Sequence, residues 1–365
     1  MKITLDKDVL LEKLAVGLKF VSNRLSSIPA LQGILMEKKE GTIYFYATNL
    51  IVYYQSYIET EDKKDNFRIV VEAKKIVEFL SLLPSGKIEI EIKENTVYIN
   101  SKRNRGSFPT IESGDFPEAP KITEAKQKIK SSFLEKNLPL IAFATAADET
   151  RPVLTGINLI TQDEDLIMVA TDGFRLSLLK TKKEIDIPQA IVPADFLMEV
   201  VSLTKKETEV DFVYSSQEKA VAFLSGKDRF FSRLIEGDFP QFEKVVPTEK
   251  KTSIELDKEE FQRNIKLVSI FARDFSNIVV LQTTETGLRI SPKTDDNEVN
   301  SASQEAVIKG EPQKVAFNFK YLLDFLNHLT AKKVFIEINR SDGPVVFKSE
   351  DRLEFLHIIM PVRIQ

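Results

Sequence analysis

The sequence predicts an α+β protein built from three similar domains, each with two helices packed against antiparallel sheets. Three observations support this class. Amphipathic helical patterns recur six times, at intervals of about sixty residues. Short alternating runs that are typical of strands lie between them. The motif Gly-Asp-Phe-Pro occurs at 114–117 and again at 237–240. Units repeated at such a period stack on one another, so the pattern indicates a scaffold rather than a catalytic centre.

The six helices are expected to begin near the following residues: Asp6, Glu72, Ser131, Pro193, Asp257 and Asn318. Each pattern places apolar residues three and four positions apart, which gives the helix one buried stripe. The stripes comprise Val9, Leu10, Leu14 and Leu18; Ile76, Phe79, Leu80 and Leu83; Phe133, Leu134, Leu138 and Ile141; Phe196, Leu197, Val200 and Val201; Phe261, Ile265 and Val268; and Tyr321, Leu322, Phe325 and Leu326.

Strands are expected in the runs that are rich in β-branched and aromatic residues and bounded by Gly, Pro, Asn or Asp. These runs are 42–47, 88–92, 96–99, 166–170, 210–214, 221–224, 288–290 and 334–338. Two helices per domain divide the chain into three parts, and each Gly-Asp-Phe-Pro motif lies where one pair of helices ends. The predicted domains are therefore 1–122, 123–250 and 251–365.

Composition indicates a soluble globular protein, because 42% of residues are hydrophobic and 29% are charged. Without cysteine the chain has no disulfide, thiol nucleophile or thiolate metal site. No apolar run reaches the length of a membrane-spanning helix, and the first ten residues do not resemble a signal peptide. A cytoplasmic protein is the expectation.

The net charge of −4 argues at first against a nucleic-acid partner. Charge is unevenly distributed, however. The six helix-bearing segments (6–24, 71–87, 124–151, 193–207, 255–273 and 317–333) hold 21 Lys and Arg against 17 Asp and Glu. The remainder is acidic by eight charges. Ordinary solvated helix faces would also explain so small an excess, but the asymmetry fits a weakly positive helical surface beside acidic strands.

Catalytic patterns are scarce. The two histidines, His328 and His357, neighbour no evident nucleophile or metal-ligand pattern in the sequence. Neither a P-loop nor a dinucleotide fingerprint occurs, so we expect no nucleotide chemistry, cofactor or metal. Paired carboxylates cannot be recognised without geometry, which leaves a carboxylate-dependent hydrolase open as an alternative.

The segment 170–176, Ala-Thr-Asp-Gly-Phe-Arg-Leu, follows a predicted strand. Thr-Asp-Gly is typical of a turn between two strands. The apolar flanks and the arginine are more than a turn requires, and they point to a further role for this segment.

Over its whole length the chain resembles the bacterial DNA polymerase III beta subunit, the sliding clamp. ATDGFRLSLL at 170–179 is similar to the family's A-T-D-G-x-R-L signature, and RPVLTG at 151–156 is similar to the segment before it. EGDFPQFEKVVP at 236–247 resembles the end of the second domain. FNFKYLLDFLNHL at 317–329 and IIMPVR at 358–363 resemble the third. The order and spacing of these matches make the resemblance specific.

The resemblance implies a head-to-tail dimer of three-domain chains that forms a closed ring around duplex DNA, without reading its sequence. Such a clamp is a processivity factor and not an enzyme. Its partners would be the polymerase III catalytic subunit, an ATP-dependent clamp loader, and other replication and repair proteins that carry short clamp-binding peptides. A repeat-built scaffold with a peptide cleft but no DNA role remains the second hypothesis.

By motif match, the partner-peptide cleft would lie between the second and third domains. It would comprise Leu154, Thr171, Gly173, Phe174, Arg175, Leu176, Pro240, Val245, Asn318, Tyr321, Ile358, Met360, Pro361, Val362 and Arg363. Such a site would bind a peptide with an amide residue at one end and Leu/Phe anchors at the other. Leu154, Leu176 and Tyr321 would serve equally well as ordinary core residues. Lys244 stands where an arginine occurs in the family, and Phe174 makes the rim more apolar.

The family's other contacts map onto two further sets. Arg24, Lys74 and Arg151 would face DNA, although Pro152 and Val153 depart from an aromatic pair found in some members. The dimer interface would use an edge strand at 102–108. Its residues would be Arg103, Arg105 and Phe108, meeting Ile270, Glu298 and Glu305 of the other chain. Gly106 replaces an apolar side chain there, which predicts a weaker interface.

Overall fold

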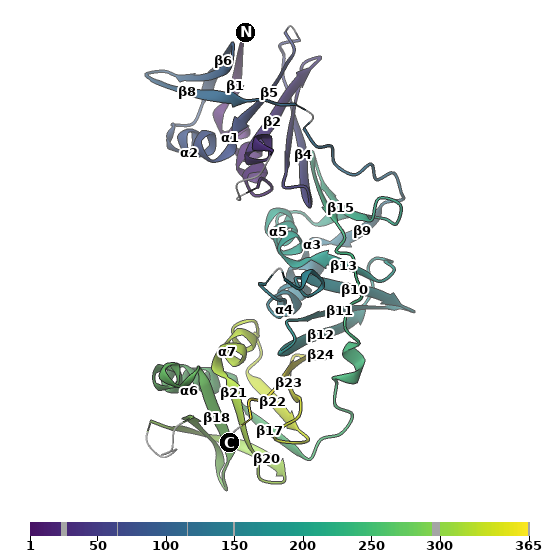
Figure 1. Ribbon diagram of the computed structural model, residues 1–365, viewed down its shortest axis with the longest axis vertical. Coiled ribbons are helices and arrows are strands. Elements are labelled where there is room, and N and C mark those ends of the chain that lie inside the picture. Colours follow the sequence, from purple (N-terminus) through teal and green to yellow (C-terminus); the bar gives the residue numbers. More distant parts are fainter. Residues whose placement is uncertain (23–27, 64, 115, 149, 294–299, 364–365) are drawn as a thin grey trace. The chain divides into compact units, whose positions relative to one another are not determined.

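The computed structural model describes residues 1–22, 28–63, 65–114, 116–148, 150–293 and 300–363. It contains two compact units, one formed by residues 1–131 and 202–234 and the other by residues 132–201 and 235–365. Each unit is organised around a twelve-stranded antiparallel sheet. We describe the units one at a time (Figure 1).

In unit 1 the strands follow the order β1 (Lys2–Asp6), β6 (Lys87–Lys93), β7 (Thr96–Ser101), β8 (Asn104–Ile111), β5 (Phe67–Glu72), β2 (Gly33–Lys39), β3 (Thr42–Thr48), β4 (Val52–Glu59), β16 (Asp228–Arg233), β15 (Ala220–Ser225), β14 (Glu209–Ser215) and β9 (Gln127–Lys130). The helices α1 (Lys7–Leu18) and α2 (Ala73–Leu82) contact each other and pack on this sheet (Figure 1).

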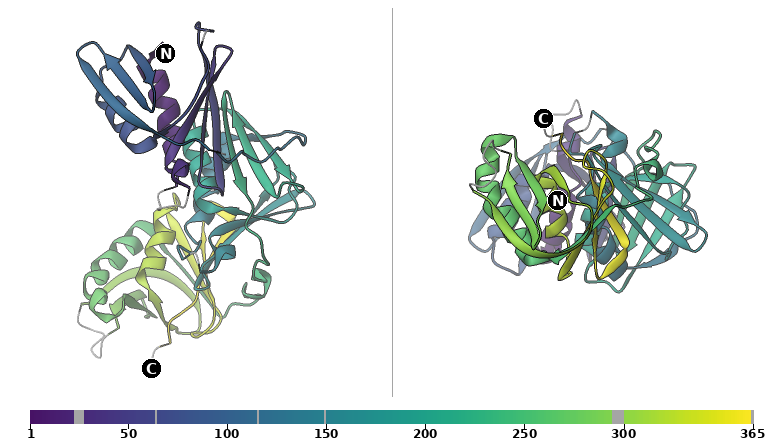
Figure 2. Two further views of the ribbon diagram at one scale, coloured as in Figure 1. Left: turned by 45° about the horizontal axis from the view of Figure 1, so that its top comes forward. Right: turned by 90° about the horizontal axis from the view of Figure 1, so that it is seen from below.

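In unit 2 the order is β13 (Ala190–Pro193), β10 (Gly156–Gln162), β11 (Asp165–Thr171), β12 (Arg175–Lys182), β24 (Arg352–Ile359), β23 (Val345–Ser349), β22 (Lys333–Ile338), β17 (Thr252–Asp257), β20 (Ala302–Gly310), β19 (Gly287–Pro292), β18 (Ile278–Thr283) and β21 (Lys314–Asn318). The helices α6 (Lys258–Ala272) and α7 (Phe319–Asn327) contact each other beside it, as Figure 2 shows in two further views.

The remaining helices are α3 (Ser131–Asn137), α4 (Pro139–Ala142) and α5 (Ala194–Thr204). With them the chain reads as three copies of one element order: strand, helix, four strands, helix, three strands. The copies run from β1 to β8, from β9 to β16 and from β17 to β24. The first helix of the second copy is divided into α3 and α4 at Pro139, which has no backbone N–H to continue the helix. The predicted fold class of three similar α+β domains is confirmed.

The helix starts follow from local chemistry. Asp6 accepts hydrogen bonds from the backbone N–H groups of Asp8 and Val9, and thereby caps α1. Asp257 caps α6 through Glu260, at 2.8 Å, in the same way. Asn318 is the corresponding cap of α7. A side-chain oxygen at this position satisfies a backbone donor that the helix leaves unpaired.

The predicted apolar stripes are largely buried. Leu10 and Leu14 of α1 and Phe261, Ile265 and Val268 of α6 lie in the core. Val9 departs from the predicted stripe, because it lies on the solvent side of α1 and is exposed. Leu18, Phe79, Phe133 and Tyr321 are only half-buried, and the Tyr321 ring lies beside an arginine.

Each copy of the repeat contributes two four-stranded half-sheets. Two sheet junctions join successive copies within the chain. In unit 1, β4 of the first copy pairs with β16 of the second, from Gln55 opposite Arg229 to Val52 opposite Ser232. In unit 2, β12 of the second copy pairs with β24 of the third, so that Leu176 lies opposite Ile358. Both junctions therefore pair the fourth strand of one copy with the last strand of the next.

Candidate functional site

The segment 170–176 forms a tight turn between β11 and β12. The Thr171 hydroxyl donates to the backbone oxygen of Arg175 at 2.6 Å and accepts from the N–H of Gly173. One carboxylate oxygen of Asp172 accepts from the N–H groups of Phe174 and Arg175, at 2.9 and 3.0 Å. Gly173 has φ +91°, a conformation that strains other residues. This bonding leaves the Phe174 side chain 57% exposed.

Arg175 connects this turn to α7. Its Nε donates to Asp172 at 3.0 Å and its Nη1 to Asp324 at 2.5 Å. The guanidinium also lies over the ring of Tyr321, 4.7 Å from the centroid, and over Phe143 at 5.7 Å. Burial, followed by the negative charge of Asp172, raises the pKa of the Tyr321 phenol. Arginine suits this place because its planar group both stacks and forms two directed ion pairs.

The C-terminal segment runs past the same turn. The backbone N–H of Met360 donates to the oxygen of Phe174 at 2.8 Å, and that of Val362 donates to Ala316 of β21. Met360 is 36% exposed, while Ile358 beneath it is almost completely buried. Phe174 and Met360 therefore present two flexible, apolar side chains at one surface, joined by a main-chain hydrogen bond.

A buried cluster supports this surface from below. It includes Leu176, Ile358, Phe239 and Phe242, with half-buried Val245 packed against it. Leu154 is also buried, as are Leu176 and Ile358, and a contact with a peptide stays a prediction for all three.

The other predicted residues of the site vary in exposure. Pro240 and Arg363 are exposed, whereas Pro361, Val362 and Asn318 are half-buried. All fifteen predicted cleft residues belong to unit 2. The structure thus places the turn, the C-terminal segment and the start of α7 in contact through the hydrogen bonds and ring contacts given above.

Sequence reasoning missed the partners of Arg175. Asp324 and Phe143 lie on segments remote from 170–176, and nothing in their local patterns indicates this contact.

Sequence reasoning also missed the environment of His357, whose Nδ1 lies 2.8 Å from the Ser177 hydroxyl. Both side chains are completely buried, and the His357 ring stacks on Phe325. A Ser–His pair sealed from solvent offers no place for a substrate, so we assign it to packing at the β12–β24 junction.

This buried histidine predicts a pH dependence of stability. Burial, together with the positive charges of Arg175 and His328, holds the pKa of His357 well below its ordinary value. Below a pH of roughly 6.5 the unfolded chain takes up a proton that native His357 does not accept. The free energy of unfolding should then fall by about 1.4 kcal/mol per pH unit.

Urea unfolding between pH 7.5 and 5.5 measures this slope, in a range where ordinary carboxylates stay ionised. We expect His357→Gln to remove most of the slope and His328→Gln, at the exposed end of α7, to retain it. An unchanged slope in His357→Gln would contradict this origin.

Of the three predicted DNA residues, Lys74 belongs to unit 1 and Arg151 to unit 2. Arg24 lies outside the described residues. Lys74 is exposed on α2. The Nη2 of Arg151 donates to the backbone oxygen of Asp172 at 3.2 Å, which places this residue against the turn of the candidate peptide site. A role in DNA contact remains a prediction for each of them.

The predicted dimer residues lie on two surfaces. On the first, Phe108 of β8 is mostly buried and its ring packs edge-on against Phe79 of α2. Arg105 is 3.7 Å from Glu91 and stacks on Tyr98 within the same chain, and Arg103 is exposed in the turn before β8.

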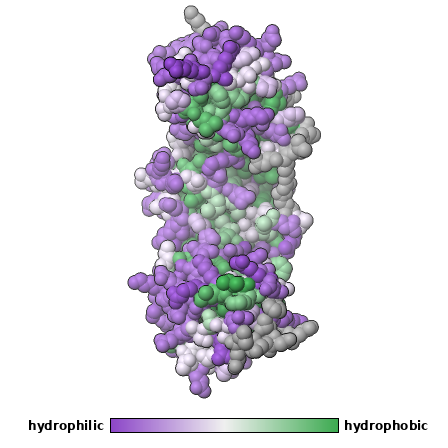
Figure 3. Space-filling model, turned by 90° about the vertical axis from the view of Figure 1, so that its left-hand side faces the viewer, coloured by the Kyte–Doolittle hydropathy of each residue, from purple (hydrophilic) through white to green (hydrophobic). Residues whose placement is uncertain are grey.

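On the second surface, Ile270 of α6 is 58% exposed, next to exposed Leu267 and Phe271. These residues form an apolar patch over α6, called the α6 patch below (Figure 3). Glu305 is exposed on β20, and Glu298 lies outside the described residues.

β8 and β20, which lie inside the sheet orders, each keep part of one edge unpaired within the described chain. Residues 104–109 of β8 pair with β7 on one side, while β5 reaches only residues 110 and 111 on the other. Residues 302–305 of β20 pair with β19, while β17 pairs only with residues 306–310. An open edge with free N–H and C=O groups is a template for pairing with another chain.

Within the described residues, no helix has the length and apolar character needed to cross a membrane. The same residues contain no cluster of His, Asp or Glu side chains arranged to hold a metal ion.

Three models of the DNA polymerase III beta subunit match the chain in order: the N-terminal domain over residues 1–120, the central domain over 128–241 and the C-terminal domain over 243–363. The chain is 28% identical to the beta sliding clamp of Bacillus subtilis, with both chains covered completely.

Solved structures agree. The crystal structure of the Bacillus subtilis DNA polymerase sliding clamp superimposes with a TM-score of 0.88 at 28% identity, covering both chains completely. The Thermotoga maritima DNA polymerase III beta subunit, at 24% identity and complete coverage of both chains, shares the fold with a TM-score of 0.91. With three domain models matched in sequence and nearly every residue covered, the chain belongs to the DNA polymerase III beta subunit family.

Proposed function

We propose that this protein is a DNA sliding clamp: two chains form a closed ring around duplex DNA and tether the replicative polymerase to its template. The family and the clamp relative support this function. The single observation that carries the ring is the pair of open strand edges on β8 and β20.

The repeat explains why these two edges would pair. Each internal junction joins the fourth strand of one copy to the last strand of the next copy, as β4 joins β16 and β12 joins β24. After both junctions are made, the chain retains one unused strand of each kind: β20, the fourth strand of the third copy, and β8, the last strand of the first.

A third junction of the same kind therefore needs a second chain, joined head to tail. Two such junctions close two chains into a ring with twofold symmetry. In this assembly β8 of one protomer would pair antiparallel with β20 of its partner. The α6 patch would be covered near Phe108, and Arg103 and Arg105 would meet acidic side chains such as Glu298 and Glu305.

The charge distribution suits a ring that slides. Many phosphate contacts by Lys and Arg would make binding tight and strongly dependent on salt. This chain has a net charge of −4, with a small positive excess in the helix-bearing segments alone. A closed ring does not need strong contacts, because it is retained by topology. Arg24, Lys74 and Arg151 are the basic residues that we propose to touch the duplex.

The surface around Phe174 and Met360 would receive the partners. Exposed Phe174 and Met360, backed by the buried cluster, offer adaptable apolar contacts to Leu and Phe anchors of a peptide. The polar groups of Arg175, Asn318 and Arg363 would orient the peptide. Polymerase, clamp loader and repair proteins carrying such peptides would compete for this one surface.

The clamp would act as a processivity factor without catalysis, in the cytoplasm where bacterial DNA is replicated. Opening of the ring would rely on ATP hydrolysed by the loader. Primer extension by a bacterial polymerase III with its loader tests this function. Adding the protein should lengthen the products of a single binding event. Unchanged product length, with a competent loader and a peptide that binds, would contradict the proposal.

A further inference from the structure

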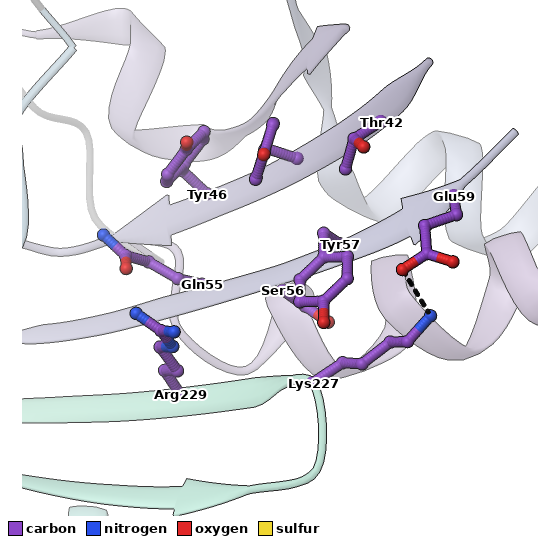
Figure 4. Close-up of a pocket in the computed structure, with 9 residues that line it drawn as sticks. Thr42, Tyr46, Gln55, Ser56, Tyr57, Glu59, Lys227 and Arg229 are labelled. Atoms are coloured by element: carbon purple, nitrogen blue, oxygen red, sulfur yellow. Dashed lines mark ion pairs between the residues drawn. The ribbon is translucent and has the colours of Figure 1, made fainter. Parts of the chain in front are cut away.

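The exposed face of the unit 1 sheet carries two adjoining pockets that the clamp function does not use. One, of about 500 Å³, is lined by Thr42, Tyr44, Tyr46, Gln55, Ser56, Tyr57, Glu59, Lys227 and Arg229 (Figure 4). The other, of about 410 Å³, continues from it under the segment 116–122 and also borders Arg68 and Glu37. Tyr46, Gln55 and Arg229 line both, so the two form one elongated hollow, called the tyrosine groove below.

The repeat shows which position in unit 2 corresponds to the groove. The turn before β4 has the same bonding as the turn at 171–175: the Thr48 hydroxyl donates to Val52 at 2.8 Å, and Asn49 accepts from the N–H groups of Ile51 and Val52. Leu50, with φ +79°, occupies the place of Gly173. The backbone of Arg233 donates to Ile51 at 2.9 Å, as Met360 does to Phe174.

Aligned through these turns and strand registers, the two faces differ in chemistry. Tyr46, Gln55 and Arg229 stand where unit 2 has Val169, Leu178 and Leu356, all of which belong to or pack on the apolar cluster.

The covering segments differ as well. Counted from the shared Gly-Asp-Phe-Pro motif, Ala119 occupies the place of Phe242, a large side chain that is buried in the unit 2 cluster. A methyl group replaces a ring, so the corresponding space in unit 1 stays open. A polar, open groove has thus replaced a filled apolar core at the equivalent junction.

Aromatic rings dominate one half of the groove. Tyr44 and Tyr46 point the same way from β3, with ring centroids 6.3 Å apart, and Tyr57 lies opposite Tyr44 on β4 at 6.2 Å. All three tyrosines are half-buried, so each has ring surface to offer a ligand. A row of rings on adjacent strands is a platform on which flat ligand groups can stack in succession.

Positive charge accompanies the rings. Lys227 lies over the Tyr57 ring at 4.9 Å and is 3.7 Å from Glu59 (Figure 4). Glu37 pairs with both Lys39 and Arg68, which leaves that trio with one net positive charge.

Arg229 is exposed opposite Gln55, and within the described chain it forms no ion pair. Lys121 is balanced by Glu118. The lining therefore carries a net charge of +2, on a protein whose net charge is −4.

From this combination we infer that the tyrosine groove binds single-stranded nucleic acid, with bases stacked on Tyr44, Tyr46 and Tyr57 and the phosphate backbone along Arg229 and Lys227. Stacking accepts any base, because every base has an aromatic face, and an elongated groove with positive charge follows a strand rather than a compact ligand. An acidic peptide would use the cations but would leave the row of rings without a matching series of flat groups.

Fluorescence anisotropy of the intact protein with fluorescein-labelled (dT)20 at low salt tests the inference. Loss of stacking should weaken binding of the Tyr44→Ala/Tyr57→Ala variant by about tenfold or more. The Tyr44→Phe/Tyr57→Phe variant retains the rings and should bind within about twofold of the parent. Arg229→Ala should weaken binding and lower the slope of log affinity against log salt by about 0.7. Arg340 is an exposed arginine of unit 2, so Arg340→Ala is the matched control. It should change neither the affinity for (dT)20 nor the slope of log affinity against log salt.

Four results would overturn the inference: no binding of (dT)20 at low salt, equal binding by the alanine and phenylalanine pairs, equal affinity for a 20-base-pair duplex, or full competition by poly-glutamate. Thermal melts of each variant exclude loss of fold as the cause. Retention of the loaded ring on circular duplex should be the same in all variants, so failure at the groove is distinguishable from failure of the clamp function.

Discussion

Ile270→Asp should convert the dimer into monomers. Ile270 is the most exposed residue of the α6 patch, and its side chain makes no large contribution to the core of its own unit. A carboxylate placed there would have to lose its hydration when the partner covers it, and the interface offers it apolar neighbours in Leu267 and Phe271. We expect the dissociation constant to rise about a hundredfold or more, equivalent to roughly 3 kcal/mol.

Sedimentation velocity at micromolar concentration measures this effect. Leu353→Asp is the control, because Leu353 is 74% exposed on β24, which β23, β22 and β17 separate from β20 in the unit 2 sheet. It should remain a dimer. A charge at Phe108 would be a poorer test, since that ring is buried against Phe79 and its replacement would damage the fold of unit 1. An Ile270→Asp protein that sediments as the parent dimer would refute the proposed interface.

The Phe174→Ala/Met360→Ala variant should lose peptide binding while keeping the dimer. The two side chains are exposed apolar groups of the site, and a hydrogen bond from the Met360 backbone N–H to the Phe174 backbone oxygen joins the two residues. Truncating both removes contact area worth about 1.5 kcal/mol or more for each, which predicts an affinity loss of over a hundredfold. The backbone bonds of the turn do not depend on either side chain, so the fold should be preserved.

Titration calorimetry with a peptide that has Gln at one end and Leu-Phe at the other checks the loss. The repeat supplies a matched control: Ile51 occupies the same place as Phe174 in the equivalent turn of unit 1 and is 52% exposed. Ile51→Ala should leave peptide affinity unchanged. If Ile51→Ala weakened binding as much as the double variant does, the peptide would not be binding at the surface of unit 2.

The helices were predictable because their signals are local. Asp6, Asp257 and Asn318 combine a capping side chain with an apolar stripe that follows at once. Strands with regular alternation, such as β11 and β22, were predicted for the same reason. β8 contains Gly106 and Pro109, and β20 is mostly polar, so the alternation that marks a strand is weak in both.

Pairing between distant segments could not be read from the sequence. The junctions β4–β16 and β12–β24 join strands about 180 residues apart, and each depends on a register that local patterns do not encode. The turn at 171–175 was predicted from Thr-Asp-Gly, whereas the contact of Arg175 with Asp324 required the folded sheet to bring α7 beside it. The tyrosine groove escaped notice because its rings come from strands that look like ordinary alternating β-structure.

Encirclement of DNA is the central claim, and one measurement tests it most directly. The protein is loaded onto a nicked circular plasmid by a bacterial clamp loader with ATP, the complex is isolated, and the plasmid is then cut once with a restriction enzyme. A ring held by topology stays on the circle and slides off the free ends, so the bound protein should be lost only after cutting. Equal retention on circular and linear plasmid would mean ordinary surface binding and would contradict the clamp.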